Sequence, residues 1–100
     1  MNMNALMQQA QKMQREMEKA QKDLEAKEFE VVSAGGGIKV VITGAKNIKS
    51  IELDKDIIDP EDKEMLQDMI VIAVNEAINL VINEEQKILA NQQANMRFPF

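Results

Sequence analysis

Cysteine and histidine are both absent from this sequence of 100 residues. Their absence excludes disulfides, a Cys/His zinc site, a cysteine nucleophile and a histidine general base. Tryptophan and tyrosine are absent too, and the three phenylalanines make up 3% of the chain. Because few aromatic rings are available to stack on bases, recognition of single-stranded nucleic acid is disfavoured.

Long hydrophobic runs are also absent. The longest uninterrupted apolar run has six residues, 69–74, far fewer than the roughly 20 of a membrane-spanning helix. The N-terminus lacks the basic-then-apolar pattern of a signal peptide. We therefore expect a soluble, cytoplasmic protein with no membrane contact. Its net charge of −5 argues against a polybasic nucleic-acid binder, and its 45% apolar content suffices for the core of a single domain over residues 1–100.

Residues 3–26 carry an apolar repeat that is typical of a long helix. Apolar residues recur at alternating intervals of three and four, with no Gly or Pro among them. This apolar seam comprises Met3, Leu6, Ala10, Met13, Met17, Ala20 and Leu24. A helix of this length spans about 36 Å, whereas a compact domain of this size has a radius of gyration of about 13 Å. The sequence therefore predicts an N-terminal helix, within residues 1–26, that projects past a small core unless the C-terminal helix lies alongside it.

Between residues 27 and 56 the apolar period changes to two, which is typical of half-buried strands. Three alternating runs rich in β-branched residues centre on Val31, Val40 and Ile51, and glycines separate them. This region predicts a small three-stranded antiparallel meander. Its two open edges need cover or a pairing partner.

Three consecutive glycines, residues 35–37, admit two interpretations. In a hairpin turn, at least one of them would adopt a positive φ. A phosphate-binding loop would instead lead into a helix whose N-terminus receives the anion. Because a β run follows and no Gly-Lys-Ser/Thr is present, the turn is favoured.

The third block predicts a helix over residues 59–93. Asp59 suits the N-cap, and Pro60 suits the first helical position. Residues 94–100, with Pro99 near their end, are expected to form a flexible tail.

This C-terminal helix has more apolar surface than a three-stranded sheet can cover. Eleven of the fourteen residues 69–82 are apolar. One narrow polar stripe, into which Ile72 also falls, comprises Asp68, Asn75, Asn79, Asn83 and Gln86. A second protomer is the simplest additional cover. The predicted homodimer interface comprises Met69, Ile70, Ile72, Val74 and Ile78.

Four basic residues of the first helix, spaced by three, four and three, are the most informative candidates. This basic row comprises Lys12, Arg15, Lys19 and Lys22. In helical angle it lies almost opposite the apolar seam, and acidic residues flank it. Two interpretations remain open: an ordinary solvated face, or a row that contacts phosphates. If the row is only solvated, the alternative contacts are Lys39, Lys46 and Lys49 on the sheet and its turn.

The order of these segments resembles the YbaB/EbfC family of bacterial nucleoid-associated proteins. The resemblance rests on the Met/Gln/Lys-rich first helix, the glycine triplet, the run Ile51-Glu52-Leu53-Asp54, and the segment from Asp59-Pro60-Glu61-Asp62 to Met69-Ile70. It implies an α+β fold of order α-β-β-β-α in a tweezer-like homodimer with projecting helical arms. It also implies double-stranded DNA as a partner and a cytoplasmic, nucleoid-associated location.

We therefore predict a homodimeric nucleoid-associated protein that contacts duplex DNA mainly through backbone phosphates. The alternative is a dimeric protein-binding clamp or chaperone-like scaffold, which the methionine-rich first helix favours. No enzymatic activity, cofactor, metal or small-molecule substrate is expected, because no carboxylate pair or metal-ligand spacing stands out in the sequence.

Overall fold

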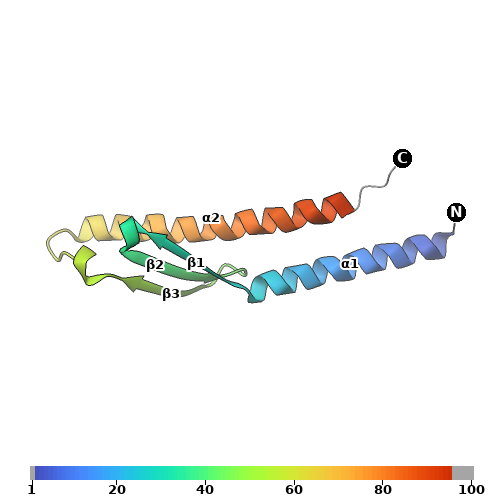
Figure 1. Cartoon of the computed structure of the whole chain (residues 1–100), viewed down its shortest axis with the longest axis horizontal. Coiled ribbons are helices and arrows are strands. Elements are labelled where there is room, and N and C mark those ends of the chain that lie inside the picture. Colours follow the sequence, from blue (N-terminus) through green and yellow to red (C-terminus); the bar gives the residue numbers. More distant parts are fainter. Residues whose placement is uncertain (1, 96–100) are drawn as a thin grey trace.

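The chain folds into two long helices joined through a small sheet (Figure 1). A computed structural model describes the backbone of residues 2–95 and the side chains of residues 2–91. The elements are α1 (Met3–Ala26), β1 (Glu28–Ser33), β2 (Ile38–Thr43), β3 (Ile48–Leu53) and α2 (Lys63–Asn95). Their order, α-β-β-β-α, and the three-stranded antiparallel sheet confirm the predicted fold. Of the predicted tail, residues 94 and 95 continue α2, and residues 96–100 lie outside the described residues.

Helix α1 begins and ends where the apolar repeat does. The Asn2 side chain accepts a hydrogen bond from the Asn4 backbone N–H (3.0 Å) and so caps the first turn. Lys27, in an extended conformation, is the one residue between α1 and β1. The helix points away from the sheet, and the protein measures 72 × 24 × 17 Å with a radius of gyration of 20.0 Å (Figure 1). The predicted projection of this helix is therefore present in the protomer.

The sheet has the order β1-β2-β3, with β2 in the centre. Its inner face is built by alternate residues of β2, namely Ile38, Val40 and Ile42, which are fully buried. Directly opposite them on β3 lie Leu53, Ile51 and Ile48, with a bulge at Val41/Ile42 that lets Ile48 face Ile42. The inner face is therefore continuously apolar across β2 and β3.

Helix α2 packs across β1 and β2 and leaves β3 without comparable cover. Ala73, Ala77 and Val81, each four residues apart, are fully buried against the inner face of the sheet. All six residues of β3 are exposed. The core thus lies between one helix and two strands, and the apolar face of the third strand meets solvent in the protomer.

Helix α2 begins at Lys63, four residues after the predicted N-cap, so the predicted start at Asp59 is wrong. The Asp59 side chain accepts from the Glu61 N–H (3.0 Å), and its carbonyl accepts from the Asp62 N–H (3.0 Å). These bonds close a turn that contains Pro60. The Asp62 carboxylate then accepts from the Met65 N–H (3.3 Å). Asp62, three residues after the predicted cap, therefore caps the helix, while Asp59 belongs to the preceding turn.

Helix α2 is also long and apolar enough, by length and composition alone, to cross a membrane over Lys63–Asn91, with a mean hydropathy of 1.6. The longest apolar run does not indicate this property, because Asn75, Glu76 and Asn79 interrupt the run without making the helix polar on average. Of its most apolar 18-residue window, 17% is buried within the protomer. Of the eleven apolar residues in 69–82, three are buried, six are partly buried, and Val71 and Ile72 are exposed in the protomer.

Candidate nucleic-acid interface

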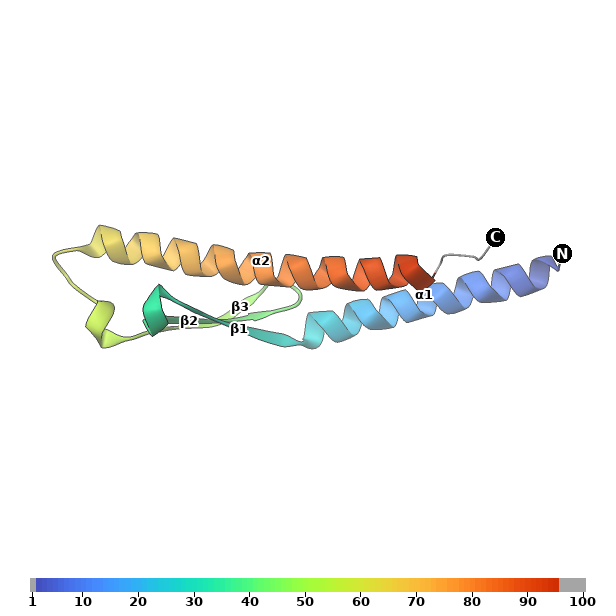
Figure 2. The same cartoon turned by 45° about the horizontal axis from the view of Figure 1, so that its top comes forward.

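The basic row of α1, Lys12, Arg15, Lys19 and Lys22, is exposed on the helix that projects from the sheet (Figures 1 and 2). The opposite side of the helix becomes gradually buried toward its C-terminal end. Leu6 and Ala10 are exposed, Met13 and Met17 are half-buried, and Leu24 is 5% exposed. We call α1 the arm, and the rest of the described chain the body. The arm therefore presents its cations to solvent and uses its other side to join the body.

Lysines of the sheet and its turn differ from the basic row because they have carboxylate partners. Lys39 Nζ lies 3.5 Å from Glu30 Oε1 and 4.0 Å from Glu52 Oε2. Lys49 Nζ lies 3.7 Å from Glu28 Oε1. These pairs lie on the outer face of the sheet, which α2 does not cover, and partly neutralise it.

Lys46, in the turn between β2 and β3, has the shortest of these contacts. Its Nζ lies 3.1 Å from Glu85 Oε1 on α2. On the arm, by contrast, none of the four cations of the basic row forms an ion pair within the part of the chain that is described. The three alternative DNA contacts predicted from sequence are thus already neutralised, and the basic row is not.

Acidic side chains weaken the positive potential of the arm without removing it. Glu16, Glu18, Asp23 and Glu25 are all exposed beside the basic row. Glu18 Oε1 accepts a 3.5 Å hydrogen bond from the Gln14 side chain. Residues 3–26 of the arm contain four basic and four acidic residues, so its net charge is zero and the positive potential is confined to the basic row. A phosphate backbone at the basic row therefore meets cations flanked by carboxylates, which favours a modest affinity.

The end of the molecule opposite the arm is strongly acidic. Residues 52–68 contain eight carboxylates and two lysines, and they surround the turn that leads into α2 (Figure 1). At an ionic strength of 0.1 M the Debye length is about 10 Å, so this charge acts locally rather than on the arm tens of ångströms away. It repels nucleic acid from that end and leaves the arm as the electrostatically accessible surface.

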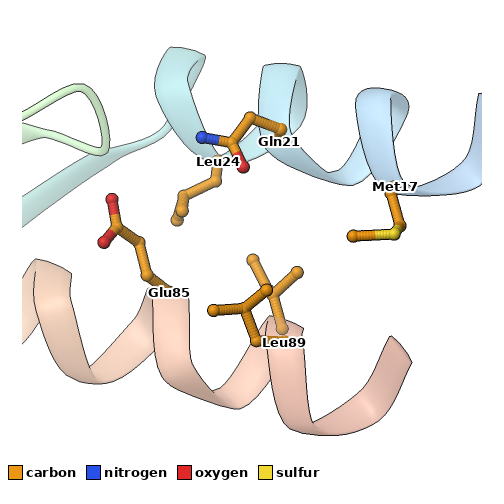
Figure 3. Close-up of a pocket in the computed structure, with 6 residues that line it drawn as sticks. Met17, Gln21, Leu24, Glu85 and Leu89 are labelled. Atoms are coloured by element: carbon orange, nitrogen blue, oxygen red, sulfur yellow. The ribbon is translucent and has the colours of Figure 1, made fainter. Parts of the chain in front are cut away.

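A groove lies between the arm and α2 (Figure 3). Met17 and Leu24 from the arm, and Ile88 and Leu89 from α2, form its apolar walls, and Gln21 and Glu85 add polar groups. Its volume is about 250 Å³. This is the surface on which a protein-binding clamp would hold an apolar side chain.

The glycine triplet forms the turn between β1 and β2. Gly35 and Gly36 have φ of 64° and 96°, so the expected positive φ is confirmed. The backbone continues directly into β2. Two acidic residues, Glu52 and Asp54, and one basic residue, Lys39, line the surface beside Gly36 and Gly37, which makes it a poor phosphate site. The geometry supports the turn.

Across the described residues no group of three or more acidic, histidine or cysteine side chains is arranged to hold a metal ion. The same part of the chain contains no buried side-chain nitrogen or oxygen atom that lacks a hydrogen-bond partner.

Three residues of the predicted dimer interface, Met69, Ile70 and Ile78, pack against the protomer's own core and are partly buried. Val74 is half-buried, and Ile72 is 54% exposed on the outer side of α2. Their role in a dimer stays a prediction. Sequence reasoning missed the exposed apolar residues of β3, Ile48, Ile51 and Leu53. Their alternation predicted a strand, but nothing local indicated that α2 would leave that strand uncovered.

An elongated α-β-β-β-α protein with an exposed row of four cations on its helical arm is the class that fold and surface define. The sequence profile of the YbaB/EbfC DNA-binding family matches residues 1–96. The chain belongs to this family.

Bacterial relatives are named nucleoid-associated proteins. A nucleoid-associated protein of Ruminiclostridium cellulolyticum is 60% identical over 77 residues, which are 77% of this chain and 67% of that protein. A nucleoid-associated protein of Alkaliphilus metalliredigens is 46% identical over 98 residues, covering 98% of this chain and 86% of the relative. The crystal structure of an uncharacterised Helicobacter pylori protein, 20% identical, matches with a TM-score of 0.75 over 93% of this chain and 98% of that one. That likeness shows the fold.

Proposed function

We propose that this protein is a homodimeric, nucleoid-associated DNA-binding protein that contacts duplex DNA mainly through backbone phosphates. The basic row of each arm makes these contacts. Phosphate contacts position a protein on DNA without reading its sequence, so discrimination between duplexes is weak unless DNA shape contributes. The names of the bacterial relatives support association with the nucleoid and hence a cytoplasmic location. Binding is the whole of this function, which involves no enzymatic step.

One observation carries the choice of the arm: its four cations are exposed and unpaired within the described residues, whereas Lys39, Lys46 and Lys49 each face a carboxylate. A phosphate that binds the arm releases counterions and breaks no ion pair. A phosphate that binds these lysines competes with the carboxylate that each already faces. The outer face of the sheet is therefore the weaker site.

The homodimer is supported by the apolar surface that one protomer leaves open. The inner face of β3 exposes 39% of Ile48, 39% of Ile51 and 36% of Leu53. On α2, Val71 and Ile72 are more than half-exposed, and the other predicted interface residues are partly buried. Surfaces of this kind, continuous with a protein core, mark interaction sites. A second copy with two-fold symmetry covers the same surface on both chains and provides two arms.

The test replaces the four residues of the basic row with glutamine and measures duplex binding at several salt concentrations. A dimer offers up to eight phosphate contacts, so the log–log salt slope of the parent has a magnitude of at most about 7. Glutamine is nearly as good a helix former as lysine or arginine. We therefore expect the variant to stay folded and dimeric, to lose affinity about equally for every duplex, and to show a flatter slope.

A matched control removes four positive charges from the body instead, at Lys39, Lys49, Lys55 and Lys63. It should bind DNA with nearly the slope of the parent, because its net charge changes as much but its arm does not. Equal losses in the two variants would assign the effect to net charge and would contradict the proposal. If the parent binds no duplex even at low salt, the protein-binding clamp, with the groove between Met17 and Leu89, becomes the better explanation.

A further inference from the structure

The arm is attached to the body almost entirely at its C-terminal end. Leu24 is its one buried side chain within the described residues. The Lys27 backbone N–H donates to the Leu24 carbonyl (3.1 Å), and β1 begins at the next residue. Because no longer linker intervenes, whatever holds Leu24 and Lys27 also fixes the direction in which the arm leaves the body.

The turn between β2 and β3 holds both of these residues. Gly44 is buried in this turn, and its N–H donates to the Lys27 carbonyl (2.9 Å). A Cβ atom on Gly44 would overlap the backbone carbonyl of Leu24 and lie 2.9 Å from its Cγ. The φ of Gly44 is not in the left-handed region, unlike those of Gly35 and Gly36. Glycine is therefore required here for close approach of two backbones rather than for its conformational freedom.

The same turn also reaches α2. Lys46, with a φ of 68°, places its Nζ 3.1 Å from Glu85 Oε1. Glu85 lies across the groove from Leu24 (Figure 3). The turn is held in shape by Thr43, which donates its N–H to the Asn47 carbonyl (2.9 Å) and accepts the Lys46 N–H at its own carbonyl (2.9 Å). One short turn thus contacts the base of the arm on one side and α2 on the other.

We propose that this turn, residues 44–47, is a bracket that sets the direction of the arm relative to the body, with Gly44 and Leu24 as its positioning residues. The consequence for DNA rests on the proposed function: in a dimer, the direction of each arm sets the spacing of the two basic rows. An arm of about 36 Å converts a small shift at its base into a larger shift at its tip. A side chain at position 44 therefore moves the cations without touching them.

The absence of cysteine allows a direct test, because two introduced cysteines can carry spin labels without competition from native thiols. Gln9→Cys on the arm and Asn79→Cys on α2 are both at exposed positions. Labelled chains are diluted into unlabelled ones so that distances within one chain dominate. In this background, Gly44→Ala should displace the arm-to-body distance distribution, and Leu24→Ala should broaden it. Ala45→Ser, at the exposed neighbouring position in the turn, should leave it unchanged.

The same variants without labels are titrated with duplex DNA. Gly44→Ala should bind about tenfold more weakly than the parent, because the two basic rows no longer reach their phosphates together, while Ala45→Ser should match the parent. If the distance distribution is unchanged in both Gly44→Ala and Leu24→Ala, the turn does not set the direction of the arm and the proposal is wrong. If Gly44→Ala fails to fold, Leu24→Ala decides alone.

Displaced distances with unchanged DNA affinity would overturn the positioning role. The distance measurement needs no DNA. A parent that binds no duplex would therefore remove the proposed function while the bracket is still decided by the spin labels.

Discussion

Gly35 and Gly36 lie where the chain reverses between β1 and β2, with φ of 64° and 96°. Nothing lies within 4 Å of the position that a Cβ would take at either residue. The demand for glycine at these two positions is therefore conformational. Gly37 differs, because a Cβ there would lie 2.6 Å from the Ile57 side chain. The triplet combines two separate physical requirements, and only the first was evident from sequence.

Gly36→Val should destabilise the fold by about 1–3 kcal/mol, since a β-branched residue is strained at this positive φ. The free energy of unfolding is measured by urea titration at a fixed protomer concentration. Ala45→Val, in the exposed turn between β2 and β3, serves as the control and should stay near the parent. If Gly36→Val instead lost phosphate binding while its free energy of unfolding stayed unchanged, the turn interpretation would be contradicted. The phosphate-binding loop would then be favoured.

At the scale of elements, the two helices use small residues and apolar residues differently. Ala73 and Ala77 let α2 approach the sheet closely, so that Ile38, Val40 and Ile42 are fully buried beneath it. On the arm, the heptad repeat is regular along the whole helix, but it is buried mainly at Leu24. Regular spacing therefore predicted both helices, whereas burial depends on which partner each one meets.

Ala77→Leu should lower the free energy of unfolding by about 1–3 kcal/mol, because the added atoms have no space between α2 and β2. Asn83→Leu adds a larger apolar residue on the exposed side of the same helix and should change stability little. Both are compared by urea unfolding at one protein concentration. Equal free energies of unfolding for the two variants would contradict the close packing of α2 on β2. Such a result would mean that α2 can move away from the sheet without loss of stability.

At the scale of the whole molecule, one protomer is elongated and incompletely covered. Its extent of 72 Å arises from the arm and from the length of α2. Its open apolar surface is concentrated on β3 and on the uncovered side of α2. A dimer that buries this surface should exceed the roughly 1,000 Å² that separates specific interfaces from crystal contacts.

Ile51→Glu should dissociate the dimer at concentrations where the parent stays associated. Ile51 is 39% exposed on the inner face of β3, and an interface would bury its carboxylate replacement without a partner. Ser50→Glu, opposite Val41 on the other face of the sheet, is the matched control and should remain dimeric. Sedimentation equilibrium measures both. A dimer unaffected by Ile51→Glu would place the interface elsewhere.

Ile72→Glu tests whether the interface also reaches the outer side of α2. We expect a weaker dimer, because Ile72 is a large apolar residue that is 54% exposed in the protomer. Asn79→Glu introduces the same charge seven residues along the polar stripe and provides the comparison. If the two variants associate equally well, Ile72 lies outside the interface and is simply exposed.

Local sequence determined the order of the elements, the length of the arm and the turn at the glycine triplet. These features follow from apolar periods of 3.5 and two residues and from the φ preference of glycine. All three signals depend only on residues that are close together in the sequence. The exposure of the basic row on the side of α1 opposite Leu24 follows from the same periodicity.

Only the tertiary structure decided which lysines already have carboxylate partners and which strand α2 leaves open. It also placed Gly44 against Leu24, twenty residues earlier in the chain. Each of these outcomes depends on contacts between segments far apart in sequence. A periodic pattern fixes which face of an element is apolar, whereas the packing of the other elements fixes how much of that face is covered.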